Sequence, residues 1–167
     1  MPWRDTATKF YEPIRATATS AAEKMLIEVE NEYTGSRFRL AIVGCGKIAK
    51  RHLIGAAKSD MVEVTALVDK EASRAASLAD RLGVQGLIST DLDKVLSEVD
   101  GAIIATPNNT HKDIATTCMH QGVPVLIEKP LATTTTDAES ICEVAKSTGC
   151  TVAVGYTSRF AASVTLM

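Results

Sequence analysis

The stretch "AIVGCGKIAKRH", residues 41–52, carries the main evidence for the fold that we predict for this chain. It contains the pattern G-x-G-x-x-A, formed by Gly44, Gly46 and Ala49, and it continues the apolar run "FRLAIVG" (38–44). In such a turn the first glycine permits a tight bend and the second lets backbone N–H groups approach a pyrophosphate. The small third residue lets the following helix pack closely on the sheet. The stretch therefore predicts a strand, a tight turn and a helix N-terminus, where oriented amides favour negative charge.

An acidic residue follows this turn at the spacing of a dinucleotide-binding unit. The run "VEVTALVD" (62–69) reads as a second strand that ends in Asp69, about 20 residues after the glycine turn. A carboxylate at this place can accept both hydroxyls of an adenosine ribose and repels a 2′-phosphate, so NAD is favoured over NADP. Lys70 and Arg74 follow closely, and their positive charges could reduce this preference for NAD, which leaves NADP possible. The alternative is a tight turn beside a solvated aspartate.

Short apolar runs alternate with helical patterns from residue 37 onward. Strands are expected at 38–44, 62–69, 100–106, 123–128 and 151–156, with a possible short extra strand at 86–89. Helical patterns lie between them at 47–58, 71–82, 91–98, 110–121 and 134–148. Strands that are apolar on both faces, each followed by an amphipathic helix, indicate a parallel sheet covered on both sides. The predicted fold is α/β, a Rossmann-type doubly wound parallel sheet.

Two helix starts and the N-terminal segment carry further expectations. Thr110 with Asp113 has the spacing of a capping box, and the tract 133–136 offers threonine hydroxyls to a helix start. Residues 1–36 differ in composition, and their apolar residues recur at helical spacing near 25–33. We expect a helical extension or linker there, with a partner-binding helix as the alternative.

Composition and charge exclude several classes of protein. A hydrophobic content of 46% with 23% charged residues is typical of a folded globular chain. The formal net charge of −2 gives no support to a nucleic-acid or anionic-membrane partner. No apolar run approaches the roughly 20 residues of a membrane helix. The four scattered cysteines predict small core hydrophobes in a reducing compartment, so the predicted localisation is cytoplasmic, and no metal site is expected.

Polar residues stand where several predicted strands end. They are Asp69, Thr106-Pro107-Asn108 and Glu128-Lys129-Pro130. In an open parallel sheet, ligands gather outside the carboxyl ends of the strands. We therefore expect the charged pair Glu128 and Lys129 to rim a cleft, with a salt-bridged strand end as the alternative.

Four motifs together resemble one known family. "GCGKIAKRH", "ATPNNTH", "EKPLATT" and "GYTSRF" occur in the order and spacing of the Gfo/Idh/MocA oxidoreductases, over roughly residues 37–160. The resemblance implies a nucleotide-binding domain and a hydride-transfer enzyme. It places Gly44, Gly46, Lys47 and Ile48 at the dinucleotide phosphates and Asp69 at the adenine ribose. It places Thr106, Pro107, Asn108 and His111 beside the nicotinamide half of the cofactor. Glu128 and Lys129 would lie near the ribose of that half, and Arg159 would lie beside the nicotinamide itself.

The same resemblance makes Lys129 the catalytic residue. In the family the lysine of this motif reaches the hydroxyl on the substrate carbon that loses its hydride. Its charge can stabilise a forming alkoxide, or the amine can accept a proton, and the sequence leaves both roles open. Of the histidines, His52 is expected on a helix surface, His120 at a helix C-terminus, and His111 either at the cleft or in the capping box.

The resemblance also sets expectations for the whole chain. Family members continue into a second domain that binds the sugar or polyol, and residues 161–167 would be the truncated start of the crossover to that absent domain. A small-molecule hydroxyl substrate is therefore expected only if a second domain completes the site, and the chain alone should bind NAD(H) with little dehydrogenase activity. The alternative is a non-catalytic dinucleotide-binding or interaction module. An uncovered last strand at 151–156 would favour a homo-oligomer or poor solubility.

Overall fold

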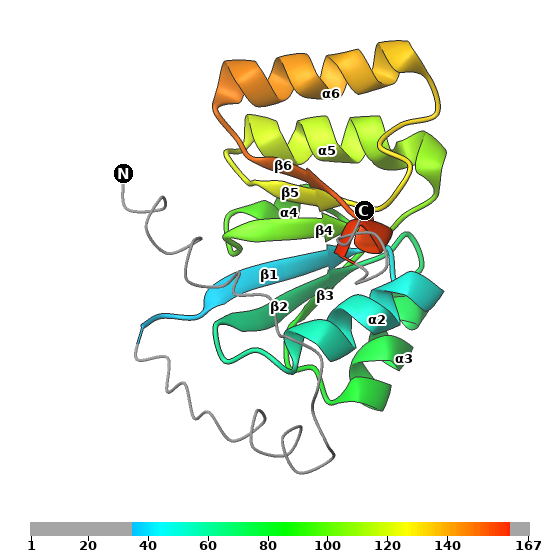
Figure 1. The fold of residues 1–167 in the computed structure, drawn as a ribbon. Helices are drawn as coiled ribbons and strands as arrows, with labels where there is room; N and C mark the ends of the chain where they lie inside the picture. Colours follow the sequence, from blue (N-terminus) through cyan, green and yellow to red (C-terminus); the bar gives the residue numbers. More distant parts are fainter. Residues whose placement is uncertain (1–34, 161–167) are drawn as a thin grey trace, which may run out of the picture. The chain divides into compact units, whose positions relative to one another are not determined.

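The glycine turn joins the central strand β1 (Phe38–Val43) to helix α2 (Lys47–Ala56) in a computed structural model that describes residues 35–160. Six strands form one sheet in the order β3-β2-β1-β4-β5-β6, and every pairing is parallel (Figure 1). The predicted helix near 25–33 and the segment 161–167 lie outside the described residues. The α/β, Rossmann-type fold predicted from the sequence is confirmed.

The remaining elements follow the predicted alternation. The strands are β2 (Val62–Val68), β3 (Leu87–Ser89), β4 (Gly101–Ile104), β5 (Val125–Ile127) and β6 (Val152–Val154). The helices are α3 (Ala72–Leu82), α4 (Asp93–Leu96), α5 (His111–His120) and α6 (Thr135–Thr148), with single 3-10 turns η2 (Asn108–Thr110) and η3 (Thr157–Phe160).

Most elements are shorter than their sequence patterns. The expected helix at 91–98 forms only at Asp93–Leu96, because a turn precedes it in which the Asp91 carboxylate accepts from the Asp93 N–H at 3.2 Å. The Ser89 hydroxyl in turn accepts from the Asp91 N–H at 3.0 Å. The short strand expected at 86–89 is present as β3. Local side-chain hydrogen bonds thus replace one helical turn.

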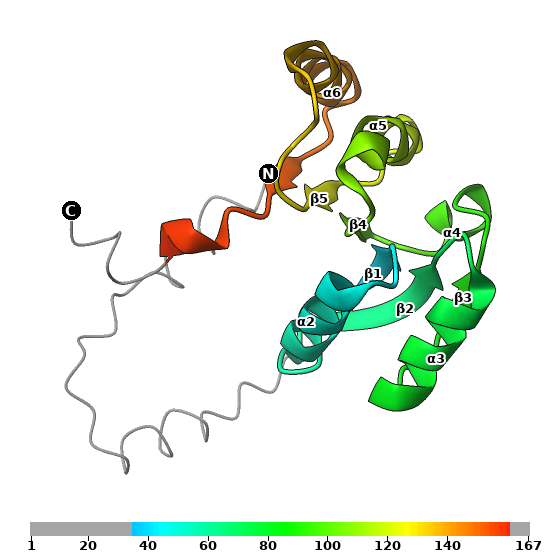
Figure 2. The same cartoon turned by 90° about the vertical axis from the view of Figure 1, so that its right-hand side faces the viewer.

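The central strands of the sheet, β1, β4 and β5, are largely buried on both faces. Ala41 and Val43 of β1 belong to the cluster packed under α4, α5 and α6, whereas Ile42 packs with Ala49 and Leu53 of α2 and with α3. Figure 2 shows the two helical layers on opposite sides of the strands. This alternation explains why the strands read as continuous apolar runs.

One of the two predicted helix caps forms. The Thr134 hydroxyl accepts from the Asp137 N–H at 3.1 Å and caps α6. The predicted capping box of Thr110 and Asp113 is wrong, since the Thr110 side chain makes no cap hydrogen bond. The 3-10 turn η2 gives Thr110 helical backbone angles, and its hydroxyl donates instead to the Pro107 carbonyl at 2.7 Å.

The cysteines do not share one environment. All four are free thiols, and Cys45 and Cys118 are buried as expected. The expectation of a core position is wrong for Cys142, which is exposed on α6, while Cys150 is half-buried. Within residues 35–160, no helix is long and apolar enough to cross a membrane.

Candidate functional site

The order in which successive strands are added to the sheet reverses between β1 and β4, which are parallel neighbours. From β1 the chain winds outward through β2 to β3, and then returns to β4, β5 and β6 on the other side. Ligands of open α/β sheets bind at such a switch point, outside the carboxyl ends of the strands. A cavity of about 700 Å³ opens there, and it is lined by Gly44, Gly46, Asp69, Thr106 and neighbouring residues. A smaller cavity of about 380 Å³ lies near the amino ends of β1 and β2, where Arg37 and Val62 are among its lining residues. It contains none of the predicted site residues.

The glycine loop forms one wall of this cavity. Gly44 has φ +92°, and a Cβ on it would lie 2.7 Å from the carbonyl oxygen of Ala105 after β4. Gly46 has no atom within 4 Å of such a Cβ, so its side toward the cavity is open. Gly46 is also the N-cap of α2, and no side chain caps that helix. The first amides of α2 are therefore left for a ligand, and an anion suits them best.

The acidic residue after β2 is fixed against this loop. One Asp69 oxygen accepts from the Cys45 N–H at 2.8 Å, and the other accepts from the Glu71 N–H at 3.0 Å. A carboxylate oxygen can accept more than one hydrogen bond, so both keep capacity for hydroxyl donors. Burial, and then the nearby Asp69 charge, raise the pKa of the Cys45 thiol to about 11. The Cys45 side chain is therefore an uncharged thiol that packs in the loop.

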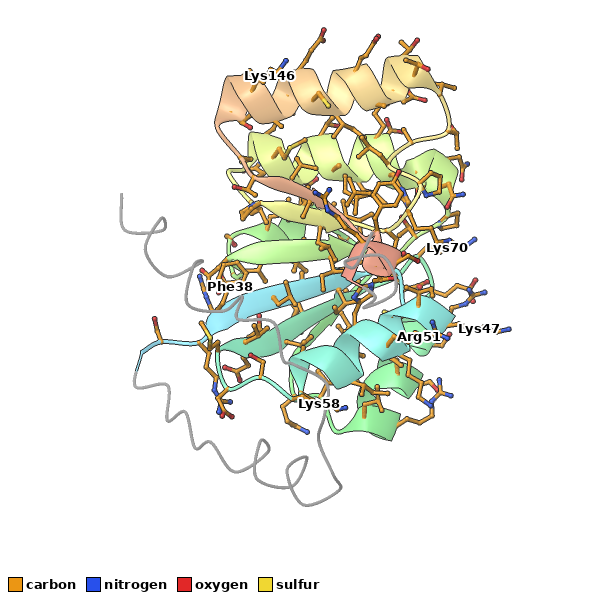
Figure 3. All side chains as sticks on the ribbon, in the orientation of Figure 1. Phe38, Lys47, Arg51, Lys58, Lys70 and Lys146 are labelled. Carbon is orange, nitrogen blue, oxygen red and sulfur yellow. The ribbon has the colours of Figure 1, made fainter. Side chains whose placement is uncertain are left out.

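Basic side chains surround the same edge. Lys47 on the first turn of α2 and Lys70 after β2 extend outward there, as Figure 3 shows. Arg74 lines the cavity with Lys70, but its Nε donates to the Glu71 carboxylate at 2.9 Å in an exposed pair. Because both side chains of this pair are exposed, the pair is weak and Arg74 keeps further donors for a ligand in the cavity.

The segment after β4 contributes both lining and support. Thr106 and Pro107 line the cavity, and Asn109 lines it rather than the predicted Asn108. His111 is completely buried, with Nδ1 2.9 Å from the Pro130 carbonyl oxygen and Nε2 3.1 Å from the Thr106 carbonyl oxygen. Its ring therefore lies beneath the site and joins the segments that follow β4 and β5.

The end of β5 places a charged pair at the rim of the sheet. Lys129 is exposed, the Lys129–Pro130 peptide is cis, and no salt bridge of residues 35–160 involves Lys129. Glu128 is only 16% exposed in its side chain, and its Oε1 lies 2.8 Å from Nε2 of His52. The surface position predicted for His52 is wrong, because α2 turns this residue toward the end of β5.

Seven of the predicted site residues do not line the cavity. They are Lys47, Ile48, Asn108, His111, Glu128, Lys129 and Arg159. Sequence reasoning missed several residues that do line it, including Thr90, Leu92, Thr110 and Ile114. Thr90 and Leu92 follow the short strand β3, so their place at a strand end was the one signal that could have identified them.

Comparison with known proteins agrees with this geometry. Residues 38–156 match the Gfo/Idh/MocA group described as an oxidoreductase family with an NAD-binding Rossmann fold. The 4-carboxy-2-hydroxymuconate-6-semialdehyde dehydrogenase of a Sphingobium species is 36% identical over 124 residues, 73% of this chain and 39% of that protein. The rhizopine catabolism protein MocA of Rhizobium meliloti is 36% identical over 125 residues, 75% of this chain and 39% of that protein.

A solved structure shows the same partial correspondence. The WlbA dehydrogenase of Chromobacterium violaceum, in complex with NADH and UDP-GlcNAcA, aligns with a TM-score of 0.74 and 28% identity, over 80% of this chain and 39% of that one. The chain thus spans about two fifths of the length of its relatives. The family match covers every strand of the sheet, together with the glycine loop and the acid after β2. The chain therefore belongs to the Gfo/Idh/MocA oxidoreductase family, whose NAD-binding Rossmann fold it contains.

Proposed function

We propose that residues 37–160 are the cofactor-binding part of an enzyme that transfers a hydride between NAD and a hydroxyl-bearing carbon of a sugar, polyol or related small molecule. One observation carries the proposal: the open glycine loop, the uncapped start of α2 and the fixed Asp69 carboxylate all face the same cavity. The similar WlbA dehydrogenase, whose solved structure contains NADH and a sugar nucleotide, supports it.

The residues of the cavity fit an adenine dinucleotide. The amides at the start of α2 would bind the pyrophosphate, and the exposed Lys47 adds positive charge there. The exposed Ile48 on the same turn offers an apolar contact. Asp69 would accept hydrogen bonds from the hydroxyls of the adenine ribose, and Thr106 and Pro107 would line the path toward the nicotinamide half.

Lys129 is the proposed catalytic residue. A bound nicotinamide supplies the hydride acceptor or donor, while the chain supplies a charge beside the reacting oxygen. The Lys129 ammonium has no salt-bridge partner within residues 35–160, so it can approach a substrate hydroxyl and stabilise its developing negative charge. Mere nucleotide binding does not require such a group, which favours the enzyme over the alternative of a non-catalytic module.

The preference between cofactors follows from charge. The Asp69 carboxylate would accept hydrogen bonds from both ribose hydroxyls and would repel a 2′-phosphate. NAD is therefore the proposed cofactor, with NADP accepted less well.

Domain limits and compartment belong to the same proposal. Residues 1–36 would be an extension of the nucleotide-binding domain at 37–160, and 161–167 would lead out of it. The four free thiols support a reducing compartment such as the cytoplasm.

Fluorescence titration with NADH and NADPH tests the cofactor site. We expect the wild-type chain to bind NADH more tightly than NADPH. Gly46→Val should weaken NADH binding at least about tenfold, since its side chain would fill the open approach of the pyrophosphate. Asp69→Ala should weaken NADH binding and narrow the difference from NADPH. Lys146→Ala, on α6 away from the site (Figure 3), should change neither affinity. A folded wild-type chain that binds no NADH would refute the proposal.

A further inference from the structure

The carboxylate of Glu128 is enclosed by three parts of the fold. One oxygen lies 2.8 Å from Nε2 of His52 on α2, and the other accepts from the Lys129 N–H at 3.3 Å. A Cβ added to Gly155, just after β6, would lie 3.5 Å from Cδ and both oxygens of Glu128. The backbone at Gly155 therefore lies close beside this carboxylate, at a distance where even an added Cβ would be in ordinary van der Waals contact with it.

The contact with His52 has a defined direction. An ionised carboxylate only accepts hydrogen bonds, so Nε2 of His52 carries the hydrogen and donates it to Glu128. Both side chains are mostly buried, at 18% and 16% exposure. Without His52, Oε1 of Glu128 would lose its one hydrogen-bond donor among residues 35–160, and a mostly buried charged oxygen without a donor is unfavourable.

The hydrogen bond joins two parts of the proposed site that are far apart in sequence. His52 lies on α2, the helix that begins at the glycine loop. Glu128 precedes Lys129, the proposed catalytic residue. The hydrogen bond between His52 and Glu128 therefore ties the segment next to Lys129 to α2, the helix that follows the glycine loop.

A second histidine holds the other side of Lys129. Nδ1 of His111 lies 2.9 Å from the carbonyl oxygen of Pro130, and its Nε2 lies 3.1 Å from the carbonyl oxygen of Thr106. The residue before Lys129 is thus held through its side chain, and the residue after it through its main chain. The lysine side chain itself stays exposed between these two anchors.

We propose that His52 is a positioning residue, which acts through Glu128 to hold Lys129 and its neighbours where the nicotinamide half of the cofactor binds. The inference rests on the proposed function of this site. When His52 is shortened, Glu128 turns toward water and the segment 128–130 loses one of its anchors, while the hydrogen bond from the Glu128 N–H to the Ile104 carbonyl and the contact of His111 with Pro130 remain. Contacts with the nicotinamide half weaken, whereas Asp69 and the glycine loop, which lie at the adenine half, keep their geometry.

Two ligands separate this role from a general loss of structure. ADP probes the adenine half alone, and NADH adds the nicotinamide riboside. For the full 167-residue chain, we expect His52→Ala to weaken NADH binding about five- to tenfold and to leave ADP binding within about twofold. His52→Gln, whose amide can still donate to Glu128, should recover most of the NADH affinity. His120→Ala, at the exposed end of α5, is the matched control and should alter neither affinity.

A double-mutant cycle tests whether His52 acts through Glu128. Glu128→Ala and His52→Ala should each weaken NADH binding, and the double variant should be no weaker than the more affected single variant, because both changes remove the same contact. Equal losses for ADP and NADH in His52→Ala, unchanged NADH binding, or additive effects in the double variant would each overturn the inference. If one of these results occurs while the wild-type chain binds both ADP and NADH, the inference about His52 fails and the proposed function stands. If the wild-type chain binds no NADH, the inference and the proposed function both fail.

Discussion

Gly44 and Gly46 belong to one sequence motif, which predicts a different role for each, and they have different environments in the structure. Gly44 has a positive φ, and its missing side chain leaves room for the backbone of Ala105 after β4. Gly46 has an extended conformation and open space beside it. The first glycine is thus required by the fold, and the second by the ligand that we propose.

Alanine at each position should separate these two requirements. Gly44→Ala should lower the free energy of unfolding by about 2–3 kcal/mol, because its Cβ would meet a backbone oxygen at 2.7 Å and its φ of +92° is unfavourable for alanine. Gly46→Ala should cost less than about 1 kcal/mol, since nothing lies within 4 Å of its Cβ. Urea unfolding followed by circular dichroism measures both. Equal losses for the two variants would contradict this assignment.

The three histidines show where residue-level prediction succeeds and fails. His120 lies exposed at the C-terminal end of α5, as its place in the helical pattern predicted. The local pattern also placed His52 and His111 on their own helices, yet their partners, Glu128 and Pro130, both come from the segment after β5. A pattern within one helix contains no information about which distant strand end will meet that helix.

At the scale of single elements, the threonine tract before α6 contains one residue that caps the helix. The Thr134 hydroxyl accepts from the Asp137 N–H and donates to the Asp137 carboxylate at 2.8 Å. The hydrogen bond from Thr134, and then that from Lys112, hold the pKa of the Asp137 carboxyl below its usual 3.8. Lys112 of α5 also lies 3.2 Å from this carboxylate, so the cap is connected to the neighbouring helix.

Thr134→Ala should destabilise the chain by about 1 kcal/mol at neutral pH, because it removes the N-cap of α6. Thr133→Ala, one residue earlier in an exposed position, should have little effect and serves as the control. Since the folded-state pKa of Asp137 is lowered, its contribution is present above the usual pKa and is lost as the pH falls through the folded value. The difference between Thr134→Ala and wild type should therefore shrink in acid. Urea midpoints at pH 7 and below pH 3.8 would show this, and an unchanged difference would contradict it.

At the scale of the whole molecule, the sheet has two edges. Within residues 35–160, β6 pairs only with β5, and Ala153 on it is exposed. The other edge is β3, where Leu87 and Ile88 are exposed at 46% and 38%. Unpaired strand edges are templates for association between chains.

We expect the chain to self-associate through β6, as its sequence predicted. Sedimentation velocity should show a species larger than the monomer that increases with concentration. Ala153→Lys should shift the chain toward monomer, since a charged residue on an edge strand opposes pairing. Ile88→Lys is the matched change on the other edge and should leave association unchanged. A wild-type monomer at high concentration would contradict this expectation, and monomerisation by Ile88→Lys alone would move the interface to β3.

Local patterns in the chain were sufficient to predict the α/β fold, the order of its strands and helices, and the dinucleotide loop. Apolar runs, glycine spacing and strand ends are all visible within roughly 30 residues of one βαβ unit, so no distant contact is needed to recognise them. How α2 meets β5, why His111 is buried and why the Thr110 hydroxyl leaves the helix start became evident only from the folded chain. The partners of His52 and His111 lie 76 and 19 residues away, and packing of the helices on the sheet, rather than local spacing, brings them into contact.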